Sequence, residues 1–141
     1  MEATDFGTFI IDICNSIYTT LGTSHNECVY QKALIIELYN HGAISVEFEK
    51  NVPVFFEDSK GNTHTIGTER IDILVKFPER VILIELKAQA TGIREHVELA
   101  QLHKYNKALS VLNVHPDISM VINFPQNCKQ TTTVEYKMFL N

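Results

Sequence analysis

Four charged side chains lie within the most apolar part of the sequence, at spacings that can bring them together. Residues 70–76 and 81–87 have the pattern of two strands, and residues 77–80 that of the loop between them. If this loop closes a hairpin, counting inward places Asp72 opposite Glu85 and Arg70 opposite Lys87. All four side chains then share one face, and both faces are otherwise largely apolar. Strands of this kind belong at the centre of a sheet.

The opposed carboxylates suggest a metal site. Two carboxylates with Cβ atoms about 5 Å apart repel each other and destabilise the strand pair. A divalent cation between Asp72 and Glu85 removes that repulsion, and hard oxygen ligands suit Mg2+ or Mn2+. The alternative is a chequerboard of salt bridges without chemistry, in which Asp72 pairs with Lys87 and Glu85 with Arg70. Because buried ionic clusters stabilise proteins only weakly, function is the commoner reason to keep one.

Hydrophobic periodicity predicts the elements that position these residues. Apolar residues at three- and four-residue steps predict a helix from Phe6 to Leu21, ending near Gly22. A second helix is expected from Ser24, which has the spacing of a capping box with Glu27, to about residue 41. The other expected elements are strands at 44–48, 52–56, 68–76 and 81–88, a turn at 58–62, a helix at 93–113, a strand at 118–124 and an edge strand at 131–139.

This order predicts one α/β domain over residues 1–141, with helices packed on a mixed sheet. The third helix is expected to connect two strands as a crossover. Its apolar side is expected to contain Val97, Ala100, Gln101, Tyr105, Ala108 and Leu112.

Composition limits the class of protein. The formal net charge is -5, which argues against a domain that coats nucleic acid by bulk charge. The three cysteines, Cys14, Cys28 and Cys128, have no zinc-ligand spacing, so a reduced cytoplasmic environment is expected. No apolar run approaches the roughly 18 residues of a membrane span, which predicts a soluble intracellular protein without a membrane partner.

An ordered set of motifs from about Ile13 to Phe124 resembles the GxxExxY proteins of the PD-(D/E)XK nuclease superfamily. Asp72 followed by Glu85-Leu-Lys87 at a strand end resembles the superfamily signature. The wider pattern comprises Leu21-Gly22, Glu27-Cys-Val-Tyr30, Ala33-Leu34, Glu37-Leu38, Gly42, Val52-Pro53-Val54, Arg70-Ile-Asp72, Glu85-Leu-Lys-Ala88, Gln101 with Tyr105, and Ile122-Asn-Phe124. Two positions depart from the family: Ser24 replaces its glycine, and Glu98 stands at the place of a histidine, with His96 two positions earlier.

The resemblance implies a restriction-endonuclease-like fold, a mixed central sheet flanked by helices. It also implies a Mg2+-dependent nuclease acting on DNA or RNA, in which Asp72, Glu85, the carbonyl of Leu86 and Glu27 bind the metal. Lys87 would position or polarise the attacking water. The rival hypothesis is a catalytically inactive module that keeps the nuclease fold for binding or regulation.

Several roles remain open at the level of sequence. Glu27 either lends its carboxylate to the metal or only closes the capping box. Gln101 and Tyr105 are one helical turn apart, so both can face the site, although Tyr105 also suits the core. Arg94 and Lys104 belong to the most basic stretch, which either contacts a phosphate backbone or is a solvated helix face. A homodimer would help so small a domain span a duplex.

Overall fold

The computed structural model describes residues 1–127 and 133–141, which form three helices and one five-stranded sheet. The helices are α1 (Ala3–Leu21), α2 (Glu27–Asn40) and α3 (Glu95–Val111). The strands are β1 (Ser45–Glu57), β2 (Thr63–Lys76), β3 (Val81–Lys87), β4 (Ile118–Asn123) and β5 (Glu135–Leu140).

Each expected helix and strand is found, but β1 differs in extent, and α2 and β2 begin at Glu27 and Thr63 instead of residues 24 and 68. The two strands expected at 44–48 and 52–56 are one continuous strand that includes Pro53. An edge strand tolerates this proline because the missing N–H can face away from its neighbour. Cys128 and the first two residues of the expected edge strand, Thr131 and Thr132, lie outside the described residues.

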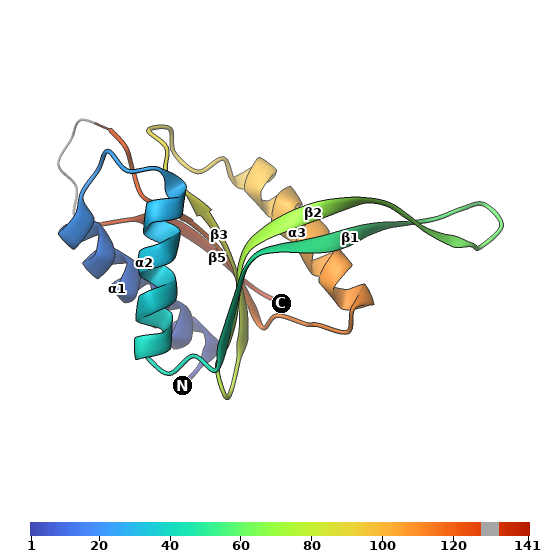
Figure 1. The fold of residues 1–141 in the computed structure, drawn as a ribbon, viewed down its shortest axis with the longest axis horizontal. Helices are drawn as coiled ribbons and strands as arrows, with labels where there is room; N and C mark the ends of the chain where they lie inside the picture. The colour runs from blue at the N-terminus through green and yellow to red at the C-terminus, as the bar shows by residue number, and fades with distance from the viewer. Residues whose placement is uncertain (128–132) are drawn as a thin grey trace.

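The sheet has the order β1-β2-β3-β4-β5 and is mixed. Strands β3 and β4 are parallel, while the other neighbours are antiparallel. Helix α3 makes the connection between the two parallel strands, as expected. It lies on one face of the sheet, and α1 and α2 cover the other (Figure 1).

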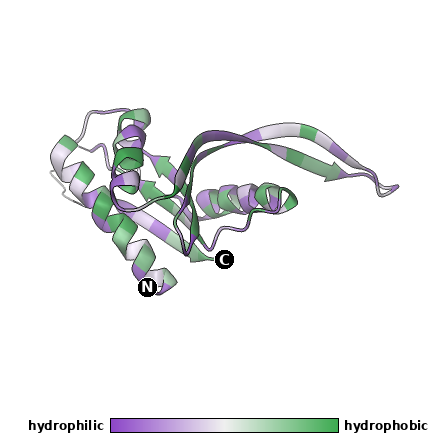
Figure 2. Cartoon of the chain, turned by 60° about the horizontal axis from the view of Figure 1, so that its bottom comes forward, coloured by the Kyte–Doolittle hydropathy of each residue, from purple (hydrophilic) through white to green (hydrophobic). Residues whose placement is uncertain are grey.

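Two hydrophobic clusters hold these layers together. The larger contains the inner sides of α1 and α2 with Ile73, Ile84 and Leu86 of the sheet. The smaller joins Leu74 and Leu83 to the inner side of α3. Hydrophobic and hydrophilic residues alternate along each helix (Figure 2). None of the described helices is both long enough and apolar enough to cross a membrane.

The outer halves of β1 and β2 form an arm that extends beyond the body of the molecule (Figure 1). The two strands remain paired out to Glu57 and Thr63, with a register shift between Val54 and Phe55. At the tip, Asp58 Oδ1 accepts hydrogen bonds from the backbone of Lys60 and Asn62, each 2.9 Å long. The turn expected at 58–62 is therefore confirmed.

The buried side of α3 differs from the expected one. Val97 and Leu112 are exposed, whereas the buried residues are Glu98, Leu102, Tyr105, Ala108 and Leu109. The prediction is confirmed for Tyr105 and Ala108 and wrong for Val97, Ala100 and Leu112, which are exposed. The helix carries apolar residues on more than one side, so counting them does not select a single face. A charged residue, Glu98, occupies the first buried position, and its partner lies on β3.

Candidate active site

The β2–β3 hairpin has the predicted register up to the candidate site. Lys76 pairs with Val81, and the ladder continues inward to Ile73 and Ile84. The ladder ends at this pair, so Asp72 and Glu85, which were predicted to lie directly opposite each other, do not pair in it. Instead, Asp72 Oδ2 accepts a hydrogen bond of 2.8 Å from the backbone N–H of Leu86.

The strand is also irregular on its other side at Asp72. In the β1–β2 ladder, Phe48 pairs with Ile73 and Lys50 pairs with Ile71. Glu49, which lies between them, is not part of the ladder, and its φ is 51°. Regular alternation along β2 would place Ile71 on the same face as Ile73, but Ile71 packs in the cluster beneath α3. The loss of regular pairing at Asp72 explains this, because strict alternation of faces requires a regular strand.

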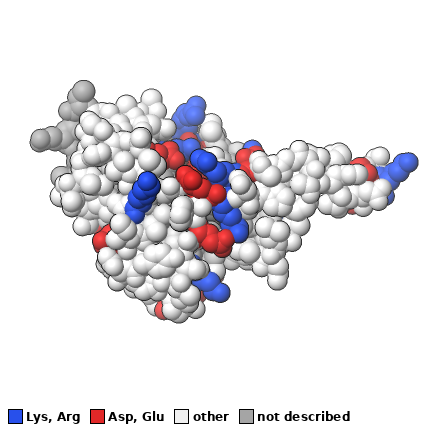
Figure 3. Space-filling model, viewed as in Figure 1, with Lys and Arg blue, Asp and Glu red and all other residues white. Residues whose placement is uncertain are grey.

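Three carboxylates from three elements interact at this point. Asp72 is 9% exposed and Glu85 5% exposed, and the two side chains are close enough for the charge of Asp72 to raise the pKa of Glu85. Glu27, at the start of α2, also interacts electrostatically with Asp72. Acidic and basic side chains gather in the middle of this face of the molecule, between α2 and the base of the arm (Figure 3).

The electrostatic environment favours protonation of two of these carboxyl groups. Burial, followed by the negative charge of Asp72, raises the pKa of Glu85 far above its ordinary range, while Lys87 lowers it. Partial burial and the charge of Asp72 likewise raise the pKa of Glu27, against the opposing effects of Lys87 and Arg70. Such mutual repulsion is what a bound cation would relieve.

Lys87 lies between two buried glutamates. Its Nζ is 3.6 Å from Glu85 Oε1 and 3.6 Å from Glu98 Oε2. Neither ion pair of the chequerboard, Asp72 with Lys87 or Glu85 with Arg70, occurs among the ion pairs of the described residues. That network is wrong because the ladder ends before Asp72 and because α3 supplies a partner that hairpin geometry alone could not reveal. Glu98 was not among the site residues predicted from the sequence. Its only signal was that a carboxylate stands where the proteins that the sequence resembles have a histidine.

No group of three or more His, Cys, Asp or Glu side chains in the described part of the chain has the arrangement of a metal-ligand set. However, Glu85 Oε2 is buried and has no hydrogen-bond partner within residues 1–127 and 133–141. An unpartnered buried carboxylate oxygen beside two other carboxylates fits the chemistry of a hard divalent cation.

The turn between α1 and α2 excludes one of the two accounts of Glu27, the capping box. Helix α2 begins at Glu27, its N-cap is Asn26, and no side chain caps it. The capping box predicted for Ser24 and Glu27 is therefore wrong. The backbone N–H of Ser24 instead donates to Gln126 Oε1 over 2.7 Å, which removes the donor that a capping glutamate would bind.

The same turn is fixed by a chain of hydrogen bonds. Gln126 Nε2 donates to the hydroxyl of Tyr30, which donates in turn to the carbonyl of Gly22 over 2.6 Å. Tyr30 is fully buried and stacks on Phe124 with ring centroids 4.3 Å apart. Tyr30 therefore belongs to the core, and its contacts hold the turn that presents Glu27 to the sheet.

Ser24 adopts a backbone conformation that favours glycine. Its φ is 71°, in the left-handed region that costs a side chain about 1 kcal/mol or more. We therefore expect Ser24→Gly to raise the free energy of unfolding by up to about 1 kcal/mol, measured by urea denaturation. Thr23→Gly is the control, because Thr23 is outside this region and glycine should destabilise there. A less stable Ser24→Gly protein would contradict the account of this turn.

The remaining predicted site residues lie on α3. Tyr105 is 3% exposed, and its hydroxyl accepts a hydrogen bond of 2.7 Å from Gln101 Nε2. Burial and the charge of Glu85 raise the pKa of Tyr105, which places this pair close to the carboxylates. Lys104 is exposed but forms an ion pair of 2.9 Å with Glu69, and Arg94 is exposed at the N-cap of α3.

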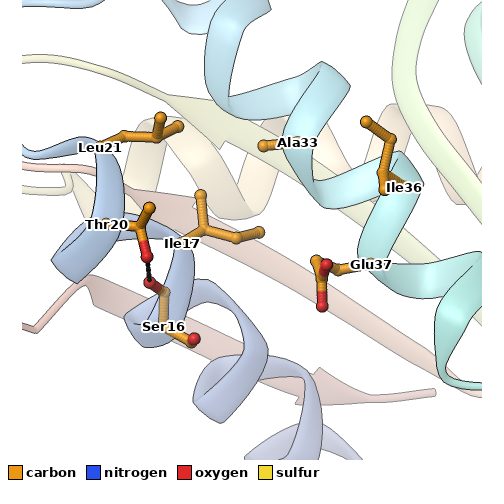
Figure 4. Close-up of a pocket in the computed structure, with 7 residues that line it drawn as sticks. All are labelled: Ser16, Ile17, Thr20, Leu21, Ala33, Ile36 and Glu37. Atoms are coloured by element: carbon orange, nitrogen blue, oxygen red, sulfur yellow. Dashed lines mark hydrogen bonds between the residues drawn. The ribbon is translucent and has the colours of Figure 1, made fainter.

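A separate pocket of about 260 Å³ lies between α1 and α2 (Figure 4). Its lining is mostly apolar, and the hydroxyl of Thr20 donates to the carbonyl of Ser16 in its own helix. The lining residues are Ser16, Ile17, Thr20, Leu21, Ala33, Ile36 and Glu37. Because none of the candidate site residues lines it, this pocket offers no support for the chemistry described above.

Comparison with known proteins gives a family and a fold. The family model described as the PD-(D/E)XK nuclease superfamily matches residues 4–135. No curated protein matches the chain. Among solved structures, the crystal structure of SSO0001 is similar, with a TM-score of 0.54 and 11% sequence identity over 96% of this chain and 77% of that chain. At that identity the similarity concerns the fold alone, and it agrees with the predicted mixed α/β architecture.

Proposed function

Because the chain belongs to the PD-(D/E)XK nuclease superfamily, we propose that it is a Mg2+-dependent nuclease of the GxxExxY type, which hydrolyses phosphodiester bonds of DNA or RNA. The observation that carries this proposal is the convergence of Glu27, Asp72 and Glu85 from three elements, with Lys87 beside them. A structural core gains little from three mutually repelling carboxylates, whereas a metal-dependent hydrolase needs them.

Asp72, Glu85, the carbonyl of Leu86 and Glu27 would hold the Mg2+ or Mn2+ ion. When bound, the ion would supply positive charge at the phosphate and make a water molecule more acidic. Glu85 Oε2 would be one of these ligands, because it is buried and has no hydrogen-bond partner in the described part of the chain. Asp72 is already oriented by the N–H of Leu86, so little side-chain entropy is lost when it binds.

The other candidate residues surround this centre. The ammonium of Lys87 can stabilise the charge that grows on the phosphate. Gln101 and Tyr105 form a preformed pair near Glu85 that can fix the scissile phosphate or its water. Arg94 and Lys104 lie on α3, where they can contact a nucleic-acid backbone. Because Lys104 is paired with Glu69, its contribution requires exchange of that partner.

The experiment is a cleavage assay on single- and double-stranded DNA and RNA, with Mg2+, with Mn2+ and with EDTA. We expect cleavage of at least one substrate only when metal is present. Asp72→Asn, purified in parallel, controls for a contaminating nuclease. If no substrate is cut in either metal, the proposal fails and the inactive binding or regulatory module is favoured.

Glu27→Gln is expected to weaken Mn2+ binding or slow cleavage by about tenfold, because a neutral amide is a poorer ligand for a hard cation. The melting temperature should change little, since Gln preserves the size of the side chain and Glu27 caps nothing. Calorimetry with Mn2+ and the cleavage assay provide the two measurements.

The matched control for this variant is Glu37→Gln, on the same helix but away from the carboxylates. It removes one negative charge and should leave both readouts unchanged. Full activity and full metal affinity in Glu27→Gln would remove Glu27 from the site.

A further inference from the structure

Glu98 is a buried carboxylate that the proposed metal site does not use. It is 3% exposed on α3, and its Oε2 lies 3.6 Å from Lys87 Nζ. The same oxygen has no hydrogen-bond partner in the part of the chain that the structure describes. A glutamate in such surroundings costs stability unless a nearby positive charge compensates it, and Lys87 is the one cation with which it forms an ion pair there.

The position of Glu98 is one that packing alone would fill with an apolar residue. It continues the buried side of α3, one turn before Leu102, which packs beneath the sheet. The side chain of Lys87 is only 22% exposed and receives a carboxylate from each side, Glu85 from its own strand and Glu98 from the helix. Two carboxylates therefore share one ammonium.

We propose that Glu98 is a positioning residue that holds the ammonium of Lys87 in the site when Glu85 binds metal. This inference rests on the proposed nuclease function. Once the carboxylate of Glu85 is engaged by a divalent cation, it attracts Lys87 less, and the cation itself repels the ammonium. Glu98 then remains as the partner that keeps Lys87 from turning toward solvent.

A first experiment tests this arrangement without metal, by NMR of protein containing 15N-labelled lysine. An ammonium held in an ion pair exchanges slowly with water and gives a signal, and Lys87→Arg identifies the signal that belongs to Lys87. Glu85→Gln imitates a Glu85 whose charge has been taken by metal. We expect the Lys87 signal to persist in Glu85→Gln and in Glu98→Gln, and to disappear in the double variant.

The Lys104–Glu69 pair provides the internal control, because its signal should be the same in all these proteins. Loss of the Lys87 signal in Glu85→Gln alone would overturn the proposal, since Glu98 would then be unable to hold the ammonium. Persistence in the double variant would overturn it as well.

A second experiment adds Mg2+ and measures cleavage. In Glu98→Gln, saturating Mg2+ should abolish the Lys87 signal that wild type retains, and kcat should fall about 10- to 100-fold with little change in KM. In the Lys87→Ala background, Glu98→Gln should cause no further loss. A further loss there would mean that Glu98 acts directly, and it would overturn a positioning role.

The two proposals fail separately. If wild type cuts no nucleic acid while the metal-free signals follow the expected pattern, the nuclease function falls and the holding of Lys87 by Glu98 stands. If wild type is an active nuclease and Glu98→Gln, at saturating Mg2+, has the kcat and the Lys87 signal of wild type, the nuclease function stands and the positioning role falls.

Discussion

Asp72→Asn is expected to abolish binding of Mn2+ and metal-dependent cleavage together. Asp72 interacts with both of the other carboxylates, so the neutral amide removes the charge at the centre of the proposed metal site. The amide oxygen can still accept the hydrogen bond from Leu86, so the local backbone should be preserved. Calorimetry with Mn2+ measures binding, and unchanged affinity in this variant would exclude the metal site.

The same variant should be more stable than wild type when metal is absent. Removal of the like charge should raise the free energy of unfolding by about 1 kcal/mol near neutral pH. The direction of the pH dependence follows from Glu85. Its raised pKa means that the Glu85 carboxyl binds a proton more tightly in the folded state than in the unfolded chain. The contribution of Glu85 to stability is therefore fully present below about pH 4.5 and is lost as pH rises toward about 9, so the gain from Asp72→Asn should be larger at pH 8 than at pH 5. Urea denaturation at both values measures the difference.

Lys87→Ala is expected to reduce cleavage about a hundredfold or more while metal binding persists. The ammonium is not a metal ligand, and its proposed task is to stabilise charge in the transition state. Metal affinity should even rise, because a positive charge next to Glu85 has been removed. The assay is kcat at saturating Mg2+ together with calorimetry.

The stability of Lys87→Ala provides a separate check. In the absence of metal, the variant leaves Glu85 and Glu98 buried without their shared cation, so its melting temperature should fall. Mg2+ should restore part of that loss by binding Glu85. Lys87→Arg retains the charge and is the control for folding. Normal cleavage by well-folded Lys87→Ala would exclude a catalytic role for this residue.

The sequence by itself determined the elements and the innermost part of the site. Two periodicities separate helices from strands, and a short loop fixes the register of a hairpin, which is why the pairing of Lys76 with Val81 followed from counting. These are local properties, since they depend on residues within a few positions of each other. The same counting along the hairpin brings Asp72, Glu85 and Lys87 close together.

The tertiary structure alone decided which residues from distant elements reach that hairpin. Ser24 and Glu27 have the spacing of a capping box, but Gln126, about a hundred residues away, takes the donor at Ser24 and leaves Glu27 beside Asp72. Periodicity likewise placed Tyr105 and Ala108 on the inner side of α3 correctly but missed Glu98, whose burial is compensated by Lys87 on β3. Local patterns indicate which structure a single helix or strand prefers. The partners of a buried charge depend instead on how elements that are far apart in the sequence pack together.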